Sequence, residues 1–190
     1  EIYLGENGVI KNLKPQSIII DMTTSSPKLA QEIYQEAQKY EIKSLDAPVS
    51  GGDVGAKNGT LAIMVGGDKE VYEEVLPIFE AMGKTICYFG KAGSGQYAKM
   101  SNQIAIASNM MGVCEAIAYA KKSGLNPDDV LKVISTGAAG SWSLSNLAPR
   151  MLQGDFAPGF FIKHFIKDMK IALDEAERMG RLHRLHGGVR

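Results

Sequence analysis

Short hydrophobic runs and amphipathic patterns alternate along the first half of the chain. Continuous apolar runs of about four to eight residues are typical of buried strands in α/β sheets. A run of this kind predicts a strand at Ser17–Met22, and further strands are predicted at Lys43–Val49, Thr60–Gly67 and Thr85–Phe89. Helical patterns lie between them, and strands that alternate with helices predict βαβ units in a mostly parallel sheet.

The first helical pattern has a clear start signal. Ser26 can serve as its N-cap and Pro27 as its first helical residue. The helical period predicts that Leu29, Ile33 and Ala37 point toward the core.

The rest of this half is assigned from its glycines and its apolar spacing. A second helix is predicted from about Lys69 to Met82. Residues 1–14 are predicted to form a loop and a turn, and the glycine-dense stretch 50–59 is predicted to be a loop.

From Ser94 onward the pattern is helical and predicts no further strand. A long helix is predicted to run to about Ser123 and to end at Gly124, because glycine is favoured just past a helix C-terminus. Asn126 is predicted to cap the next helix. Further helices are predicted at Leu144–Leu152 and Ile162–Met179. The chain is therefore expected to be α/β at first and all-helical afterwards.

The composition argues against nucleic acid and membranes as partners of this protein. The 190 residues include 21 basic and 21 acidic side chains, and this balance argues against nucleic acid. The most apolar helical stretch, 104–120, contains Asn109 and Glu115, so it is not expected to enter a membrane. No signal peptide is visible. Cys87 and Cys114 lack metal or redox spacing, so free, reduced core thiols in a cytoplasmic protein are expected.

Gly93, Gly95 and Ala98 lie between a predicted strand and the long helix. They match the dinucleotide fingerprint G-x-G-x-x-G/A only in part. The fingerprint requires a second strand within about 30 residues that ends in an acidic residue, whereas here the helix continues, so we reject it. A tight strand-to-helix turn and a phosphate-binding loop are the two interpretations of these glycines.

Lys99 and Asn102 lie three residues apart near the start of the long helix, so one helix face carries both. Lys99 is either a solvated surface residue or a lysine partly desolvated in a cleft. Its neighbours Ala98 and Met100 are small or apolar, which favours the second interpretation. Desolvation lowers the pKa of a lysine and suits it to proton transfer near neutral pH.

Two polar stretches follow predicted strands, where open α/β sheets place their ligands. Ser50, Gly51 and Gly52 form the first, and glycines there let backbone N–H groups approach a carboxylate or phosphate. A loop that only needs positive φ is the alternative. Thr24, in the second, could hydrogen-bond a ribose or phosphate, although such patterns are common.

Other candidates have simpler interpretations. Lys167 and Asp168, in the last predicted helix, are read as a surface charge pair. His183 and His186 have helical spacing, but no carboxylate or cysteine completes a metal site, so no metal is predicted. Aromatic residues expected in the core or lining a cleft are Trp142, Phe160, Phe161 and Phe165.

Together these stretches resemble the β-hydroxyacid dehydrogenase family. The most specific are DAPVSGG from Asp46 and G-x-x-G-x-G-x-x-x-K-x-x-N from Gly90. Further matching stretches are GENGV, DMTTSSP, MVGG, PGF and IKD. They keep the family's order and spacing from Gly5 to Gly180.

The resemblance implies an α/β plus all-α fold. Residues 1–91 would be the C-terminal part of a Rossmann-type NAD(P)-binding domain. A long helix would join it to a partial all-helical domain at 92–190, like that of 6-phosphogluconate dehydrogenases. The active site would lie between the two, with NAD or NADP as cofactor.

The resemblance also implies roles for individual residues. Lys99 would be the general acid/base, and Asn102 would orient the lysine or the substrate. Those implied to hold the substrate carboxylate are Ser50, Gly51 and Gly52. Those implied to contact the cofactor or to line and support its site are Thr24, Phe160, Lys167 and Asp168.

The implied enzyme transfers a hydride between NAD(P) and a small β-hydroxy acid or semialdehyde, of the tartronate semialdehyde or 3-hydroxyisobutyrate type. One alternative is a non-catalytic member that keeps the fold for binding or assembly. Another is a 6-phosphogluconate dehydrogenase-like enzyme, for which Lys57 is the only basic residue near the SGG segment. A homo-oligomer, dimer or tetramer, formed through the helical domain is expected.

Two features depart from the family pattern. The chain begins with EIYLGENGVI, without a Met and without the family's G-x-G-x-x-G segment, and its end, RLHRLHGGVR, does not match the family. We therefore expect a fragment that is largely inactive by itself.

Overall fold

The computed structural model describes residues 1–180. Their packing forms two compact units. The first contains Glu1–Ser101 together with helix α9 (Ile162–Arg178), and the second contains Asn102–Phe161. The boundary expected between residues 91 and 92 concerns the family's domains rather than packing, and it stays a prediction.

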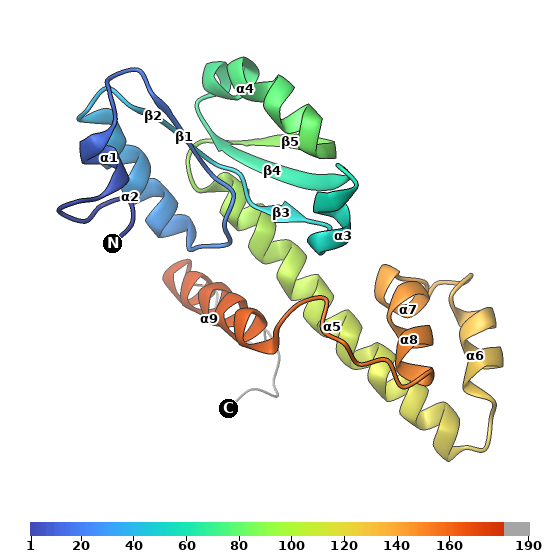
Figure 1. Cartoon of the computed structure of the whole chain (residues 1–190). Helices are drawn as coiled ribbons and strands as arrows, with labels where there is room; N and C mark the ends of the chain where they lie inside the picture. Colours follow the sequence, from blue (N-terminus) through green and yellow to red (C-terminus); the bar gives the residue numbers. More distant parts are fainter. Residues whose placement is uncertain (181–190) are drawn as a thin grey trace. The chain divides into compact units, whose positions relative to one another are not determined.

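A five-stranded sheet runs through the first unit (Figure 1). Strands β1, β2, β4 and β3 lie in that order, and β5 pairs with β4. The strands are β1 (Ile18–Asp21), β2 (Lys43–Asp46), β3 (Val49–Ser50), β4 (Leu61–Gly67) and β5 (Gly83–Gly90). All of the predicted strand regions are therefore confirmed, although the run at Lys43–Val49 is divided between β2 and the start of β3.

The predicted βαβ pairing is confirmed for β1 with β2 and for β4 with β5, but the sheet is mixed rather than mostly parallel. Strands β1 and β2 are parallel, as are β4 and β5, but β4 is antiparallel to both β2 and β3. Strand β3 follows β2 almost directly and pairs with β4, so that Val49 lies opposite Ile63. Strands joined by a short connection pair antiparallel, because a parallel return needs a long crossover. Strand β4 therefore reverses direction.

Besides α9, four helices among the described residues lie wholly within this unit. They are α1 (Val9–Asn12), α2 (Pro27–Gln38), α3 (Gly52–Lys57) and α4 (Lys69–Met82). Helix α4 has the predicted bounds. Helices α1 and α3 lie within the stretches 1–14 and 50–59, so the prediction that these are loops alone is wrong. In α1, the buried side chain of Ile10 packs into the core and offsets the cost of forming so short a helix.

The start of α2 confirms the predicted cap, because the Ser26 hydroxyl accepts a 3.1 Å hydrogen bond from the Leu29 backbone N–H. The predicted inward position of Leu29 is wrong, since its side chain is exposed. Ala30 is buried instead, together with Ile33 and Ala37. Positions 30, 33 and 37 follow the helical period as well as position 29 does, so periodicity alone could not choose between them.

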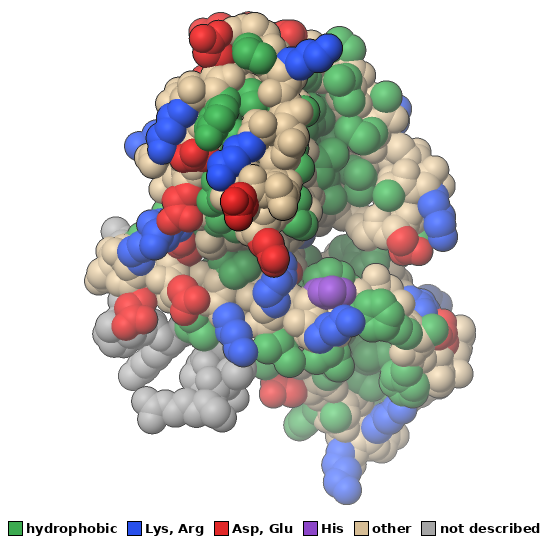
Figure 2. Space-filling view, turned by 60° about the vertical axis from the view of Figure 1, so that its left-hand side comes forward, with side chains coloured by type: hydrophobic (Ala, Val, Ile, Leu, Met, Phe, Trp, Pro, Cys, Tyr) green, Lys and Arg blue, Asp and Glu red, His purple; other side chains and the backbone are tan. Residues whose placement is uncertain are grey.

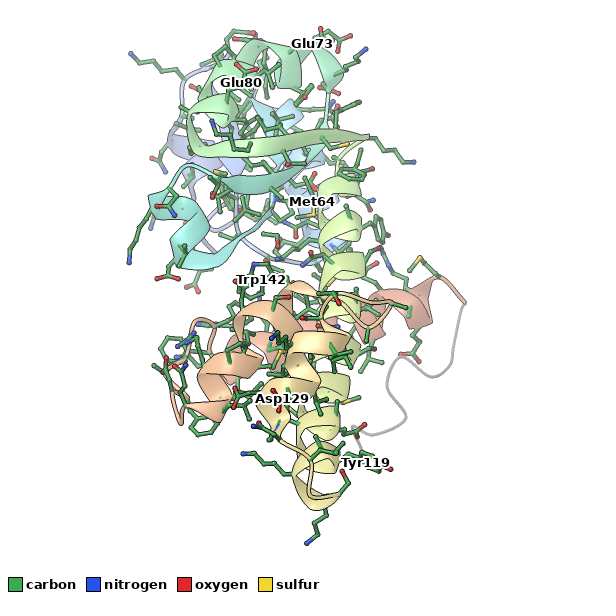
Figure 3. All side chains as sticks on the ribbon, turned by 90° about the vertical axis from the view of Figure 1, so that its right-hand side faces the viewer. Met64, Glu73, Glu80, Tyr119, Asp129 and Trp142 are labelled. Atoms are coloured by element: carbon green, nitrogen blue, oxygen red, sulfur yellow. The ribbon has the colours of Figure 1, made fainter. Side chains whose placement is uncertain are left out.

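Two apolar clusters hold the first unit together. Strand β1 joins them, because Ile19 belongs to one cluster while Ile18 and Ile20 pack against the other. Both faces of β1 are thus covered, which explains its continuous apolar run. Glu73 and Glu80 lie on the outer side of α4 (Figure 3). The inner side of α4 places three buried residues in the core, namely Val71, Val75 and Phe79.

The second unit is helical throughout its described residues. Helix α5 (Ser94–Lys122) begins in the first unit and continues into the second. It is followed by α6 (Pro127–Ile134), α7 (Trp142–Asn146) and α8 (Ala148–Leu152). The core of the second unit is formed by Val113, Leu131, Leu144 and Ala148.

Caps and breaks in the second unit follow local chemistry. The Asn126 side chain accepts a 2.9 Å hydrogen bond from the Asp128 backbone N–H, which confirms the predicted cap. The single helix predicted at Leu144–Leu152 is instead divided between α7 and α8. Pro149 lacks an N–H group, and its ring disfavours helical continuation from the preceding turn.

Several side chains expected in the interior are exposed. Cys87 and Cys114 are free thiols, as predicted, but both lie at the surface. Trp142 is 68% exposed, and Phe160 and Phe161 are exposed as well. The core alternative is therefore wrong for these three residues, and the cleft-lining alternative stays a prediction. Trp142 is the first residue of α7, and the other two lie in the loop before α9.

The distribution of surface charge and the hydropathy of the helices can be compared with the predictions about partners. Acidic and basic side chains are interspersed over the face drawn in Figure 2, in keeping with the balanced composition. Within residues 1–180, none of the helices combines the length and the hydropathy that crossing a bilayer requires. His183 and His186 lie outside the described residues.

Candidate functional site

The N-terminus of α5 is held by a carboxylate from the sheet. Asp46, at the end of β2, is buried, and its two oxygens accept hydrogen bonds from the backbone N–H groups of Gly93 (2.7 Å) and Gln96 (2.9 Å). The first N–H groups of a helix have no partner within the helix, so Asp46 acts as its cap. Burial raises the pKa of Asp46, while the hydrogen bonds from these N–H groups lower it.

Glycines allow this close approach of helix and sheet. A Cβ atom on Gly95 would lie 2.3 Å from the carbonyl oxygen of Met64 and 2.7 Å from that of Asp46. Gly93 has a φ of +89°, in the region that favours glycine. These contacts account for both glycines through a tight strand-to-helix turn.

Lys99 lies on the second turn of α5, and its side chain is buried, with only 6% exposed. The interpretation of Lys99 as a solvated surface residue is therefore wrong. Burial lowers the pKa of Lys99 below its ordinary value, the Asp168 carboxylate opposes this shift, and the Lys167 cation adds to it. The result is a lysine whose neutral form is more accessible than in water.

Asp168 and Lys167 reach this place from α9. The Asp168 carboxylate is fully buried, and the Lys167 ammonium lies 2.9 Å from one of its oxygens. Lys167 also donates a hydrogen bond to the backbone carbonyl of Thr24, in the loop that follows β1. Because one partner is buried and the other contacts a distant loop, the interpretation of a simple surface charge pair is wrong.

A second polar cluster anchors α9 on the first turn of α5. The Tyr97 hydroxyl donates a 3.2 Å hydrogen bond to the buried carboxylate of Glu175. The Arg178 guanidinium donates to the same carboxylate oxygen (3.1 Å from Nε) and to the Tyr97 oxygen (2.9 Å). Glu175 lies two helical turns after Asp168, so this cluster helps to set where Asp168 stands.

Gln96 connects α5 with the loop that carries Thr24. Its side chain is completely buried. The amide oxygen accepts a 3.1 Å hydrogen bond from the Ser25 backbone N–H, and the amide nitrogen donates a 2.8 Å hydrogen bond to the Thr23 carbonyl. The loop after β1 is thus attached to the helix that carries Lys99.

The Ser50-Gly51-Gly52 segment lies in the first unit, where β3 ends and α3 begins. Gly51 has a φ of +129° and Gly52 a φ of +62°, so both occupy conformations that favour glycine. A Cβ atom on Gly52 would meet nothing within 4 Å. The segment therefore needs its glycines for backbone conformation and has an open side at Gly52. Binding of a carboxylate there stays a prediction.

Asn102 and Phe160 belong to the second unit. Asn102 is half-buried, and its amide nitrogen donates a 2.8 Å hydrogen bond to the Gln103 side chain. The Phe160 side chain is exposed. The structure thus brings together Lys99, Lys167, Asp168 and Thr24. The roles of Asn102 and Phe160 stay predictions.

The sequence did not single out Asp46, Gln96 or Glu175. An acidic residue at the end of a strand and a glycine-rich turn before a helix are both visible in the sequence, and together they could have suggested a cap from the sheet. Gln96 carries no local signal, because its side-chain partners lie 71 and 73 positions away in the chain. Glu175 has a local partner in Arg178, but its contact with Tyr97 spans 78 positions and is not visible in the sequence.

Comparisons with known proteins match both parts of the chain. The family model for the NAD binding domain of 6-phosphogluconate dehydrogenase matches residues 1–90. The model for the NAD-binding domain of NADP-dependent 3-hydroxyisobutyrate dehydrogenase matches residues 93–187, half of the chain.

Individual relatives agree with these models. The uncharacterized oxidoreductase YkwC of Bacillus subtilis is 66% identical over 95% of this chain and 62% of its own length. The 2-hydroxy-3-oxopropionate reductase of Escherichia coli is 41% identical over 94% of this chain and 61% of its own length. The chain thus spans about six tenths of the curated relatives that it matches.

A solved structure shows the same fold. The 3-hydroxyisobutyrate dehydrogenase of Mycobacterium tuberculosis, solved with L-serine, superposes with a TM-score of 0.85 at 33% identity. The match covers 93% of this chain and 63% of that one.

Proposed function

The chain belongs to the β-hydroxyacid dehydrogenase family, and from this premise we propose that the full-length protein transfers a hydride between NAD(P) and a small β-hydroxy acid or its semialdehyde. Lys99 is the general acid/base of this reaction. The observation that carries the proposal is the burial of Lys99 close to the Asp168 carboxylate, which leaves its pKa lowered.

Two opposing effects suit Lys99 to proton transfer. Burial disfavours its ammonium form, and the negative charge of Asp168 favours it. In the oxidative direction, neutral Lys99 accepts the substrate hydroxyl proton. In reduction, the Lys99 ammonium donates a proton to the developing alkoxide. A bound nicotinamide would supply the hydride chemistry, while the protein positions the groups and excludes water.

The loop after β1 has polar groups that fit a nicotinamide dinucleotide. It lies at the carboxyl end of a strand, where α/β sheets bind such ligands. Lys167 places a cation against the Thr24 carbonyl. The buried Ser25 hydroxyl has no hydrogen-bond partner among residues 1–180. Thr24 and Lys167 would contact the cofactor, with Asp168 supporting its site.

The substrate carboxylate would be held by Ser50, Gly51 and Gly52. Their backbone N–H groups and the Ser50 hydroxyl are donors that suit a small carboxylate. The open side at Gly52 leaves room for such a group. We propose substrates of the tartronate semialdehyde or 3-hydroxyisobutyrate type, and the names of the E. coli reductase and the M. tuberculosis dehydrogenase support this choice.

The test compares wild type with Lys99→Met in the full-length protein. NADH- and NADPH-dependent reduction of tartronate semialdehyde and of methylmalonate semialdehyde would be followed by absorbance. We expect turnover of at least one substrate by wild type. In Lys99→Met we expect a loss in kcat of about a hundredfold or more, because methionine fills the same space without a transferable proton.

Lys91→Met is the matched control, because Lys91 is an exposed lysine in the loop before α5. Its activity should remain within about twofold of wild type. If Lys99→Met keeps wild-type activity, the proposed role of Lys99 is wrong. If wild type turns over neither substrate with either cofactor, a non-catalytic binding role becomes the better explanation.

A further inference from the structure

The Gln96 side-chain amide is fully buried, and both of its ends are engaged by one loop. It accepts a hydrogen bond from the Ser25 N–H and donates one to the Thr23 carbonyl. These partners lie 71 and 73 positions away in the chain. A backbone N–H can only donate and a carbonyl can only accept, so the two contacts also fix which end of the amide carries oxygen.

The same loop is held at both of its ends by local contacts. The Thr23 N–H donates a 3.0 Å hydrogen bond to the Asp21 side chain, and the Ser26 hydroxyl caps α2. Neither contact fixes the segment between them, where Thr24 presents its carbonyl to Lys167. Gln96 supplies the contacts on both sides of Thr24.

We propose that Gln96 is a positioning residue for the cofactor: it fixes the Thr23–Ser25 backbone so that Thr24 and Lys167 meet in the arrangement that binds NAD(P). This inference rests on the proposed function. Gln96 lies one turn before Lys99 on α5, and its own N–H is held by Asp46. A single helix turn therefore positions both the cofactor loop and the proton-transfer lysine.

This role predicts that loss of the Gln96 side chain affects cofactor affinity but not the pH dependence of activity. Loss of the Gln96 amide frees two backbone hydrogen-bonding groups in the loop but removes no charged group near Lys99. Cofactor affinity should therefore fall, whereas the pH profile set by Lys99 should stay unchanged. A general loss of packing would lower every parameter together and would not separate these two readouts.

The first variant is Gln96→Met, in the full-length protein. Dissociation constants for NADH and NADPH would be measured by fluorescence titration, and amide hydrogen exchange would be followed across Thr23–Ser25. We expect cofactor binding to weaken about tenfold, because two hydrogen bonds to the loop are lost. We expect the Ser25 amide to exchange at least about tenfold faster. Gln35→Met, at an exposed position on α2, is the matched control and should behave as wild type.

The second variant, Gln96→Glu, remains decisive even if Gln96→Met does not fold. A protonated glutamic acid can accept from Ser25 and donate to Thr23, whereas its carboxylate cannot donate and repels the Thr23 carbonyl. Cofactor binding by this variant should therefore approach that of wild type as the pH falls. The charged groups that contact this loop are Asp21 and Lys167, and Asp46 holds the Gln96 N–H. Lys99 follows one turn later on α5, and Asp168 pairs with Lys167. Wild type contains all of these groups, so the cofactor affinity of Gln96→Glu is compared with that of wild type at each pH.

The outcomes separate the two proposals. If wild type binds cofactor and Gln96→Met binds it equally well, the positioning role is overturned while the proposed function stands. The same holds if Gln96→Glu binds cofactor more weakly than wild type and this difference does not shrink as the pH falls. If wild type binds neither NADH nor NADPH, the proposed function fails, and the positioning role fails with it.

Discussion

The Asp46 carboxylate accepts a 2.7 Å hydrogen bond from the backbone N–H of Gly93, 47 positions further along the chain. With the bond from Gln96 to the other carboxylate oxygen, it caps the longest helix from the end of β2. The first turns of that helix carry Gln96, Tyr97 and Lys99. Gln96 and Tyr97 make contacts of the candidate site, and Lys99 is its proposed proton-transfer residue. The cap therefore helps to fix the position of the site.

Replacing Asp46 with alanine should destabilise the protein by about 1–3 kcal/mol, because two buried N–H groups lose their acceptor. Urea unfolding followed by circular dichroism would measure this change. Asp53→Ala is the control, since Asp53 is exposed and its contact with Lys57 is a long surface pair of 3.4 Å. A change of less than about 0.5 kcal/mol is expected for the control. Equal effects of the two variants would contradict the capping role.

Two glycines on α5 should respond in opposite directions to alanine. Gly95→Ala would place a Cβ atom 2.3 Å from the Met64 carbonyl oxygen, so the helix must move and stability should fall by about 1–3 kcal/mol. A Cβ atom on Gly112 would meet nothing within 4 Å, and alanine favours a helix over glycine. Gly112→Ala should therefore raise stability by up to about 1 kcal/mol. Thermal unfolding of both variants tests the prediction, and destabilisation of similar size in both would refute it.

The lowered pKa of Lys99 predicts a pH-dependent stability difference between wild type and Lys99→Met. Between the lowered folded-state pKa and the ordinary value of 10.5, the unfolded chain binds more protons at Lys99 than the folded protein does. Stability due to this group therefore rises as the pH rises through that window. The unfolding free energy of wild type minus that of Lys99→Met should increase from neutral pH toward 10.5. A difference that stays constant would mean that the pKa of Lys99 is not lowered.

Activity should follow the same ionisation. Neutral Lys99 is the proton acceptor in oxidation, so kcat/KM for oxidation of the hydroxy acid should increase with pH up to the pKa of Lys99. In reduction the ammonium form is required, and kcat/KM should decrease as the pH rises through the same value. Parallel pH profiles in the two directions, at a pKa near the ordinary value of 10.5, would argue against an active lysine at this position.

The hydrogen bonds of the Tyr97 hydroxyl predict a modest loss of stability when the hydroxyl is removed. Tyr97→Phe removes its hydrogen bonds with Glu175 and Arg178 and should cost about 1 kcal/mol, because the buried carboxylate keeps its guanidinium partner. Tyr119→Phe is the control on the same helix (Figure 3), since Tyr119 is 76% exposed. Its effect should stay within about 0.5 kcal/mol in chemical unfolding. A Tyr97→Phe variant as stable as the control would show that the cluster does not anchor α9.

Features that depend on neighbouring residues could be predicted from the sequence. The caps at Ser26 and Asn126 and the extent of α4 are set by side chains within a few positions, so their patterns are visible in a single sequence. The motifs around Lys99 and Ser50 likewise pointed to the family and to its candidate residues, because they are contiguous stretches.

Features that depend on distant residues could not. The direction of β4 follows from its pairing with β3, and the choice of Ala30 over Leu29 follows from the surface against which α2 packs. Asp46 and Gln96 gain their roles only when the sheet and the loop after β1 reach α5.

The sequence by itself determined where strands and helices form, how several of them begin, and which family the chain resembles, because local propensity and contiguous motifs carry that information. Only the tertiary structure decided that Lys99 is buried and that α9 brings Asp168 close enough to act on it. Burial and charge depend on atoms that come from α5 and α9, which are far apart in the chain. The sequence pattern of a helical lysine is the same whether its side chain lies in water or is buried beside a carboxylate, but its pKa differs between the two environments.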